Sequence, residues 1–219
     1  LIIEGVELRP TASIGLACSS NDGKDVDELL RRADAAMYQS KRSGRNQFHF
    51  FDNSMTEGIA RRMEVNTQLM SALSNDELSM VYQPILDKET GKAYALEGLM
   101  RWNNPKLGFV PPDEFIGIAE SSGIILEIGT WCIKECVKSL KLLRSSGQDD
   151  LKIAINISPR QFGPNYPLAD IIDREIKEHD LPANAIELEV TEGLFLHPDE
   201  PTMQTLDRIR ESGYLLSMD

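Results

Sequence analysis

The chain has 219 residues, of which 41% are hydrophobic and 26% charged, as is usual for a globular protein with a buried core. Its formal net charge of −12 disfavours nonspecific binding to a polyphosphate backbone, although an anionic substrate remains compatible if a metal cation mediates the contact. No apolar run approaches the roughly 20 residues that cross a bilayer, because the best candidate, residues 123–133, is interrupted by Glu127.

The opening residues, LIIEGVELRP, lack the basic segment and the cleavage site of a signal peptide. They predict a strand whose start lies upstream, so we expect the chain to begin inside a domain.

Three cysteines, Cys18, Cys132 and Cys136, argue against a disulfide scaffold and indicate a reducing compartment, so we expect a cytoplasmic protein. Cys132 and Cys136 lie four residues apart in a predicted helix. A zinc site would need two more ligands nearby, so small buried helix residues are the favoured interpretation.

Residues 1–53 predict a strand at 8–17, a polar turn and a helix. The helix is expected to begin near Val26 with Asp25 as its N-cap, and to end at Gly44, because glycine suits a left-handed position after a helix.

A short strand is expected at the aromatic residues Phe48, Phe50 and Phe51. Residues 54–74 then predict a connecting helix, because their apolar side chains recur at helical spacing.

From residue 75 onward, strand-like and helix-like segments alternate, which predicts a mostly parallel sheet. Strands are expected at 79–86, 93–102, 151–157, 185–191 and 214–218, and helices at 113–122, 124–145, 167–179 and 200–212. The first two strands are joined by too few residues for a parallel crossover, so this pair should be antiparallel. An open doubly wound sheet and a (β/α) barrel both fit; a barrel would be incomplete, because closure needs about eight strands.

Oxygen-bearing side chains lie at or near the ends of four predicted strands. They are Glu97, Asn156, Glu189 and Asp219. The carboxyl ends of parallel strands carry the active site in α/β enzymes, so we expect these side chains to meet at one rim. Oxygen ligands without histidine or cysteine favour a hard cation, namely Mg²⁺, Mn²⁺ or Ca²⁺, and two such ions could hold a phosphate and activate water.

Neighbouring polar residues have alternative interpretations. Glu192 follows Glu189 and could cap the next helix instead of serving a site. Arg101 could bind a phosphate in a bidentate manner or stack on Trp102 at the surface. Gln83 in YQPI could contact a base edge or bond to the backbone, and Pro84 beside it indicates a strand end or an edge strand.

In order, the segments YQPI, EGLMRW, INISPRQF, ELEVTE and LLSMD resemble the signature motifs of the EAL phosphodiesterase family, and PPDEFIGIAESSGII resembles a further stretch of it. In residues 1–53, TASIGLA and LLRRADAAMYQSKRSGRNQ resemble the C-terminal part of a GGDEF diguanylate cyclase domain. The resemblance implies a GGDEF piece at 1–53, a connecting helix at 54–74 and the first two-thirds of an EAL domain at 75–219. The fold class it implies is α/β, a partial TIM-like (β/α) barrel with an antiparallel first strand pair, preceded by the end of an α/β GGDEF domain.

The resemblance also implies an activity, the metal-dependent hydrolysis of cyclic di-GMP to the linear dinucleotide pGpG. It assigns the metal, two ions of Mg²⁺ or Mn²⁺, to Glu97, Asn156, Glu189 and Asp219. Glu97, Glu192 and Asp219 are implied as catalytic residues, with Glu192 steadying a loop. Substrate contacts fall to Gln83, Leu99 and Arg101, and GTP phosphates in the cyclase part to Lys41 and Arg45. A homodimer formed through the EAL part is a further implication.

The sequence departs from the family pattern in two ways. Gly98 stands where the signature has alanine, which predicts a looser strand. Because its neighbour Glu97 is retained, we expect metal binding to survive. The chain also stops at the first aspartate of the D-D-F-G segment, and it lacks the later lysine and glutamate and the GGDEF motif itself. We therefore expect an excerpt that is inactive by itself. The alternative for the parent protein is a degenerate receptor that binds cyclic di-GMP without cleaving it.

Overall fold

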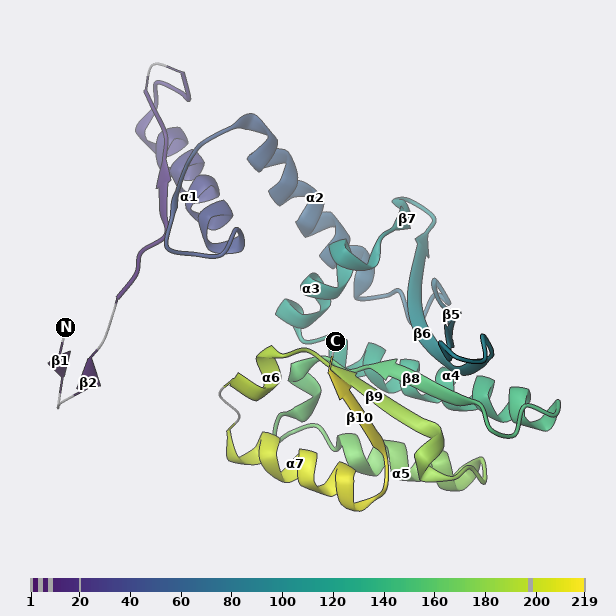
Figure 1. Cartoon of the computed structure of the whole chain (residues 1–219). Helices are drawn as coiled ribbons and strands as arrows, with labels where there is room; N and C mark the ends of the chain where they lie inside the picture. The colour runs from purple at the N-terminus through teal and green to yellow at the C-terminus, as the bar shows by residue number, and fades with distance from the viewer. Residues whose placement is uncertain (1, 4–5, 8–9, 20, 197–198, 219) are drawn as a thin grey trace. The chain divides into compact units, whose positions relative to one another are not determined.

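The computed structural model describes residues 2–3, 6–7, 10–19, 21–196 and 199–218, and the chain divides into two compact units, Leu1–Glu64 and Val65–Asp219. The boundary between the units falls inside helix α2 (Asn53–Leu69), which Figure 1 shows between them in the chain. In the described part of the chain, no helix combines the length and the apolar character that a membrane crossing requires.

In the first unit, one helix packs against two short parallel strands. Strand β3 (Ile14–Leu16) pairs with β4 (Phe48–Phe50), and α1 (Val26–Arg42) lies against them; a small antiparallel pair, β1 (Ile2–Ile3) and β2 (Val6–Glu7), precedes them. Gly15 is required for this packing, because a Cβ there would lie 2.0 Å from the Ala33 carbonyl oxygen of α1.

The predicted strand at 8–17 is wrong in its length, because among its described residues only Ile14–Leu16 is strand. The helix prediction is confirmed: α1 follows Asp25, whose side chain makes no capping hydrogen bond, and Gly44 after it has φ 106°. Helix α2 (Asn53–Leu69) is shorter than the expected 54–74. It ends in a series of turns that closes at Asp76, a residue with a left-handed φ of 54°.

The second unit is built on a mixed sheet with the strand order β10-β9-β8-β6-β5. Its strands are β5 (Leu78–Leu86), β6 (Ala93–Asn104), β8 (Lys152–Asn156), β9 (Ile186–Val190) and β10 (Leu215–Met218). As predicted, the β5–β6 pair is antiparallel and the pairs from β6 through β8 and β9 to β10 are parallel. Strand β7 (Gly108–Val110), which pairs with the end of β6, was not predicted.

Helices pack against one face of this sheet, where strands and helices share the core. They are α3 (Pro112–Ser122), α4 (Ile125–Ser145), α5 (Leu168–Glu178) and α7 (Glu200–Glu211), close to the predicted ranges, and Figure 1 shows α5 and α7 beside the strands β8 to β10. Ile153 and Ile155 of β8 point into this core, with Leu188 of β9 and Ile133 of α4. Because side chains alternate along a strand, Asn156 and Glu189 belong to the opposite face.

Three helical segments of three or four residues lie in the connections and escaped prediction because they are too short to show a repeating apolar pattern. They are η1 (Pro159–Phe162), η2 (Ala183–Ala185) and α6 (Gly193–Leu196).

Pro84 lies inside β5, opposite Leu96 of β6. Within the described residues, β5 stands at the end of the strand order, so Pro84 is in an edge strand, as predicted.

Candidate functional site

Strand register brings three of the predicted metal ligands to the same face of the sheet. Glu97 of β6 is aligned with Ala154 of β8, two residues before Asn156, and Asn156 is aligned with Glu189 of β9. The Asn156 amide nitrogen donates a hydrogen bond of 2.9 Å to Oε1 of Glu97. The three of these side chains that the structure describes therefore lie on one side of the sheet, in the lining of one cavity.

These residues line a cavity of about 460 Å³ over the carboxyl ends of β8 and β9. Its polar lining is contributed by Glu97, Arg101, Asp113, Glu120, Asn156, Ser158, Gln161, Glu189 and Thr191. The apolar lining includes Leu99, Ile116 and Ile125. A concave site that combines apolar walls with a few convergent polar groups is suited to a small organic ligand with charged parts.

Arg101 lies in the lining of this cavity and not against the indole of Trp102. Its Nη1 donates a hydrogen bond of 2.7 Å to the carbonyl oxygen of Met100. Trp102 points to the other face of β6, where it is fully buried and packs edge-on against Phe115 with ring centroids 5.6 Å apart. The stacking alternative for Arg101 is therefore wrong, and Arg101 contributes to the lining of the cavity.

Of the other predicted site residues, some line the cavity and some do not. Gln83 is directly opposite Glu97 in the antiparallel register of β5 and β6, and it is exposed. Leu99 lines the cavity. Glu192 is exposed in the turn after β9, where its backbone oxygen accepts from the Phe195 amide, and it is absent from the described lining. Asp219 lies outside the described residues.

The donor set at the rim fits a hard divalent cation in its chemistry. Glu97 and Glu189 offer carboxylate oxygens and Asn156 an amide oxygen, the ligand types that Mg²⁺ and Mn²⁺ accept. Among the described residues, no three His, Cys, Asp or Glu side chains gather as a metal cluster. The described part of the rim thus provides two acids and an amide.

Sequence reasoning missed a group of polar residues in the same cavity. Glu120 and Ser158 share a hydrogen bond of 2.7 Å, and the buried Gln161 accepts from the Ser158 amide at 3.0 Å. Two signals were present: Glu120 ends the stretch PPDEFIGIAE, and Ser158 and Gln161 follow Asn156 in INISPRQ.

Packing against α4 explains why residue 98 is glycine. A Cβ at Gly98 would lie 2.7 Å from Sγ of Cys136 and 3.2 Å from Cε of Met80. Cys132, which lines the cavity, has its Sγ 3.8 Å from Sδ of Met80. A hydrogen bond with the Cys132 thiol, and then burial, raises the pKa of the Cys136 thiol, so it stays protonated. Both α4 cysteines are buried, which agrees with the expectation of buried helix residues.

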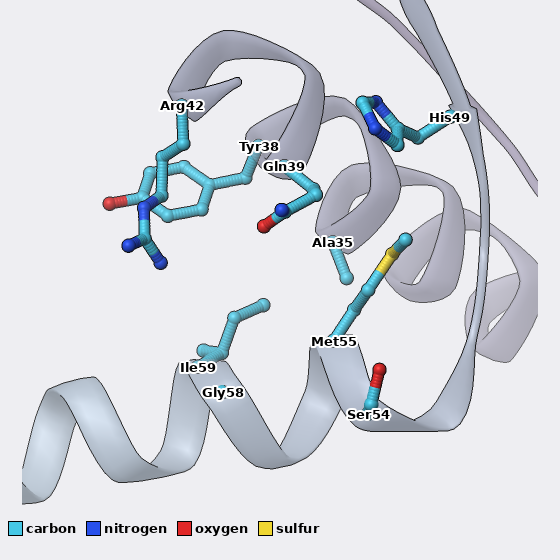
Figure 2. Close-up of a pocket in the computed structure, with 9 residues that line it drawn as sticks. All are labelled: Ala35, Tyr38, Gln39, Arg42, His49, Ser54, Met55, Gly58 and Ile59. Carbon is cyan, nitrogen blue, oxygen red and sulfur yellow. The ribbon is translucent and has the colours of Figure 1, made fainter.

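In the first unit, Lys41 and Arg45 are exposed at the end of α1, Lys41 in the last helical turn and Arg45 in the following turn with φ 61°. A separate cavity of about 300 Å³ lies between α1 and α2 (Figure 2). Tyr38 and Arg42 of α1 line it, with Ile59 of α2. Neither Lys41 nor Arg45 is in its described lining, so their role stays a prediction.

Comparison with known proteins identifies relatives for both units. The family described as EAL domain matches residues 66–219, and the family described as diguanylate cyclase, GGDEF domain, matches residues 2–47. The chain is 35% identical over all 219 residues to cyclic di-GMP phosphodiesterase NbdA of Pseudomonas aeruginosa, covering 28% of that protein. It is 33% identical over 213 residues (97% of the chain) to bifunctional diguanylate cyclase/cyclic di-GMP phosphodiesterase MucR of the same organism, covering 31% of it.

A solved structure of PaMucR phosphodiesterase in complex with c-di-GMP matches with a TM-score of 0.67 at 29% identity, over 71% of this chain and 63% of that one. The chain thus spans less than a third of both curated relatives. The structural likeness supports the predicted partial barrel over the open doubly wound sheet.

Proposed function

Because the chain belongs to the EAL domain family, we propose that its protein hydrolyses cyclic di-GMP to pGpG at the cavity formed by β6, β8 and β9. The observation that carries this proposal is the contact between Asn156 and Glu97, two residues from different strands, in a cavity that also contains Glu189 and Arg101. The names of the relatives, NbdA and MucR, support the same activity.

Each residue has a part in this proposal. Glu97, Asn156 and Glu189, together with Asp219, hold one or two Mg²⁺ or Mn²⁺ ions, which when bound acidify water and offset the charge of the phosphodiester. Arg101 binds a phosphate oxygen, because a guanidinium matches the geometry of a phosphate.

Three further residues act around that core. Leu99 provides an apolar wall for the dinucleotide. Gln83, opposite Glu97, contacts the dinucleotide from β5, and Glu192 steadies the loop after β9.

The first unit and the assembly extend the proposal. Lys41 and Arg45, both exposed cations at the end of α1, bind the phosphates of GTP when the rest of a GGDEF domain is present. The protein acts as a homodimer formed through the EAL domain.

The test is a phosphodiesterase assay of the full-length gene product with Mg²⁺ or Mn²⁺. Loss of an outer-shell partner of a metal ligand typically costs about 10- to 100-fold in activity. Glu189→Gln should lower kcat by more than this. Glu187→Gln is the matched control, because Glu187 lies two residues earlier on the same face of β9 and is absent from the described cavity lining. Hydrolysis that survives Glu189→Gln would refute the metal assignment. Binding of cyclic di-GMP without any hydrolysis in the wild type would instead show a receptor.

A further inference from the structure

A chain of hydrogen bonds runs behind the cavity from β8 to α4. Gln161 is 1% exposed; its Oε1 accepts from the Ser158 amide, and its Nε2 donates to the Tyr166 hydroxyl at 3.2 Å. The Tyr166 hydroxyl is 2.8 Å from Oγ1 of Thr130, which is itself 2.9 Å from the Leu126 carbonyl oxygen. Ser158, Gln161 and Tyr166 thus form one connected series that ends on α4.

The direction of every bond in this chain follows from proton counting. The Leu126 carbonyl can only accept, so the Thr130 hydroxyl must donate to it. Thr130 therefore accepts from Tyr166, and the Tyr166 oxygen accepts from Gln161. Since the Ser158 amide can only donate, both ends of the Gln161 amide are fixed, and a carboxylate at that position would lack the required donor.

Gly129 of α4 makes room for the Gln161 amide. A Cβ at Gly129 would lie 2.4 Å from Nε2 and 2.9 Å from Oε1 of Gln161. Gly129 is buried in the middle of α4, where glycine costs about 1 kcal/mol relative to alanine. The space for the amide gives a reason for this costly residue.

The chain of hydrogen bonds reaches Asn156 through the backbone. Asn156 is an exposed residue at the end of β8, so packing does not hold its side chain. The backbone just after it is fixed on two sides: the Ile157 amide donates to the Glu189 carbonyl at 2.9 Å, and the Ser158 amide donates to Gln161 at 3.0 Å. The backbone that carries Asn156 is thus held by β9 through Ile157 and by Gln161 through Ser158.

We infer that Gln161 is a positioning residue: it sets the direction of Asn156 toward Glu97 and thereby the affinity of this rim for a divalent cation. This inference rests on the proposed function, which makes Asn156 and Glu97 metal ligands. Outer-shell groups that orient a ligand typically contribute about 10- to 100-fold to metal affinity.

The test measures binding of Mn²⁺ alone to the nucleotide-free, full-length gene product, from the electron paramagnetic resonance signal of free Mn²⁺. Gln161→Met keeps the length of the side chain and removes both polar ends, and it should raise the Kd for Mn²⁺ about 10-fold or more. A Kd within about twofold of the wild type would overturn the inference.

Two matched pairs separate positioning from a general loss of stability. Tyr166→Phe removes the acceptor of the Gln161 amide and should weaken Mn²⁺ binding severalfold. Tyr214→Phe removes the hydroxyl of another buried tyrosine. This hydroxyl donates to Asp173 at 2.6 Å, neither residue is among the described residues that line the cavity, and the Kd should stay unchanged. Equal effects of the two substitutions would show a general loss of stability and overturn the inference. This pair also decides the question if Gln161→Met fails to fold.

In the second pair, Gly129→Ala displaces the Gln161 amide without removing a polar group and should weaken Mn²⁺ binding. Gly117→Ala in α3, where an added Cβ meets nothing within 4 Å, should not. An unchanged Kd in Gly129→Ala would count against the inference. Glu97→Gln separates a failure of the proposed function from a failure of the positioning role of Gln161. If Glu97→Gln leaves Mn²⁺ binding and hydrolysis intact, the proposed function fails. If Glu97→Gln abolishes both and Gln161→Met changes neither, only the positioning role fails.

Discussion

Replacing Gly98 with alanine should destabilise the unit Val65–Asp219, even though the EAL family pattern has alanine at this position. Two terms oppose each other. Alanine in a strand gains about 0.5–1 kcal/mol over glycine, because it loses less backbone entropy on folding. The added methyl group, however, would lie 2.7 Å from the buried Sγ of Cys136 and 3.2 Å from Cε of Met80, and overpacking of this kind costs about 1–3 kcal/mol. We expect a net loss of about 1–2 kcal/mol, or a fall in Tm of about 2–8 °C for a domain of this size.

A double-mutant cycle with Cys136→Ala isolates the contact. Alone, Cys136→Ala should cost about 1 kcal/mol for the lost buried sulfur. In that background the sulfur no longer blocks the methyl group, so Gly98→Ala should become neutral or stabilising. The expected coupling free energy is about 1–3 kcal/mol, within the range found for residues in contact.

Urea unfolding followed by tryptophan fluorescence is the assay. Both tryptophans of the chain, Trp102 and Trp131, belong to the unit Val65–Asp219, so the signal reports on that unit. If Gly98→Ala changes the free energy of unfolding equally with and without Cys136, the steric explanation for Gly98 is refuted.

Three other outcomes follow from groups outside the cavity. Burial raises the pKa of Tyr82 from 10.0 to about 12, so its contribution to stability is complete below pH 10 and is lost as the pH rises to about 12; Tyr82→Phe should remove this loss from alkaline unfolding curves. Burial acts to raise the pKa of Glu77, but hydrogen bonds, the largest from Trp102, outweigh it, and the pKa is lowered below 4.5. The stability that ionised Glu77 provides is present above pH 4.5 and is lost as the pH falls through its pKa in the folded state. Glu77→Gln should therefore flatten the acid limb of a tryptophan-fluorescence titration. It should also lower the free energy of unfolding by about 1–2 kcal/mol at pH 7. A thiol reagent should modify one cysteine rapidly in the native protein, the exposed Cys18, and three after unfolding; fast reaction of the buried pair in α4 would contradict the packing around Gly98.

Sequence patterns were sufficient for the long elements of the second unit, because these elements bury one face and show it in their spacing. Helix α4 and the strands β5 and β6 were predicted to within two residues at each end. The errors fall where local geometry overrides the pattern. The turns that end in the left-handed Asp76 shorten α2, and strand β7 has only three residues, too few to show alternation.

For the site, candidate residues near strand ends could be predicted from the sequence, but the contacts that position them could not. Glu97, Asn156 and Arg101 could be named because each follows or ends an apolar run. The sequence could not show that Gly98 faces Cys136, or that Gly129 faces Gln161, because these partners are separated by 38 and 32 positions and meet only through packing against α4. Glycine in a strand or a helix interior was the available signal, since it is costly there and calls for a close neighbour.

Pro84 has a consequence for how the protein behaves at high concentration. A proline has no amide hydrogen, so a chain arriving alongside β5 would find the row of donors interrupted in the middle of the strand. Within the described residues, β5 is therefore a poor template for adding a further strand. Pro84→Thr would restore the missing amide donor, so that extended segments of other chains could pair with the edge of β5 and promote aggregation.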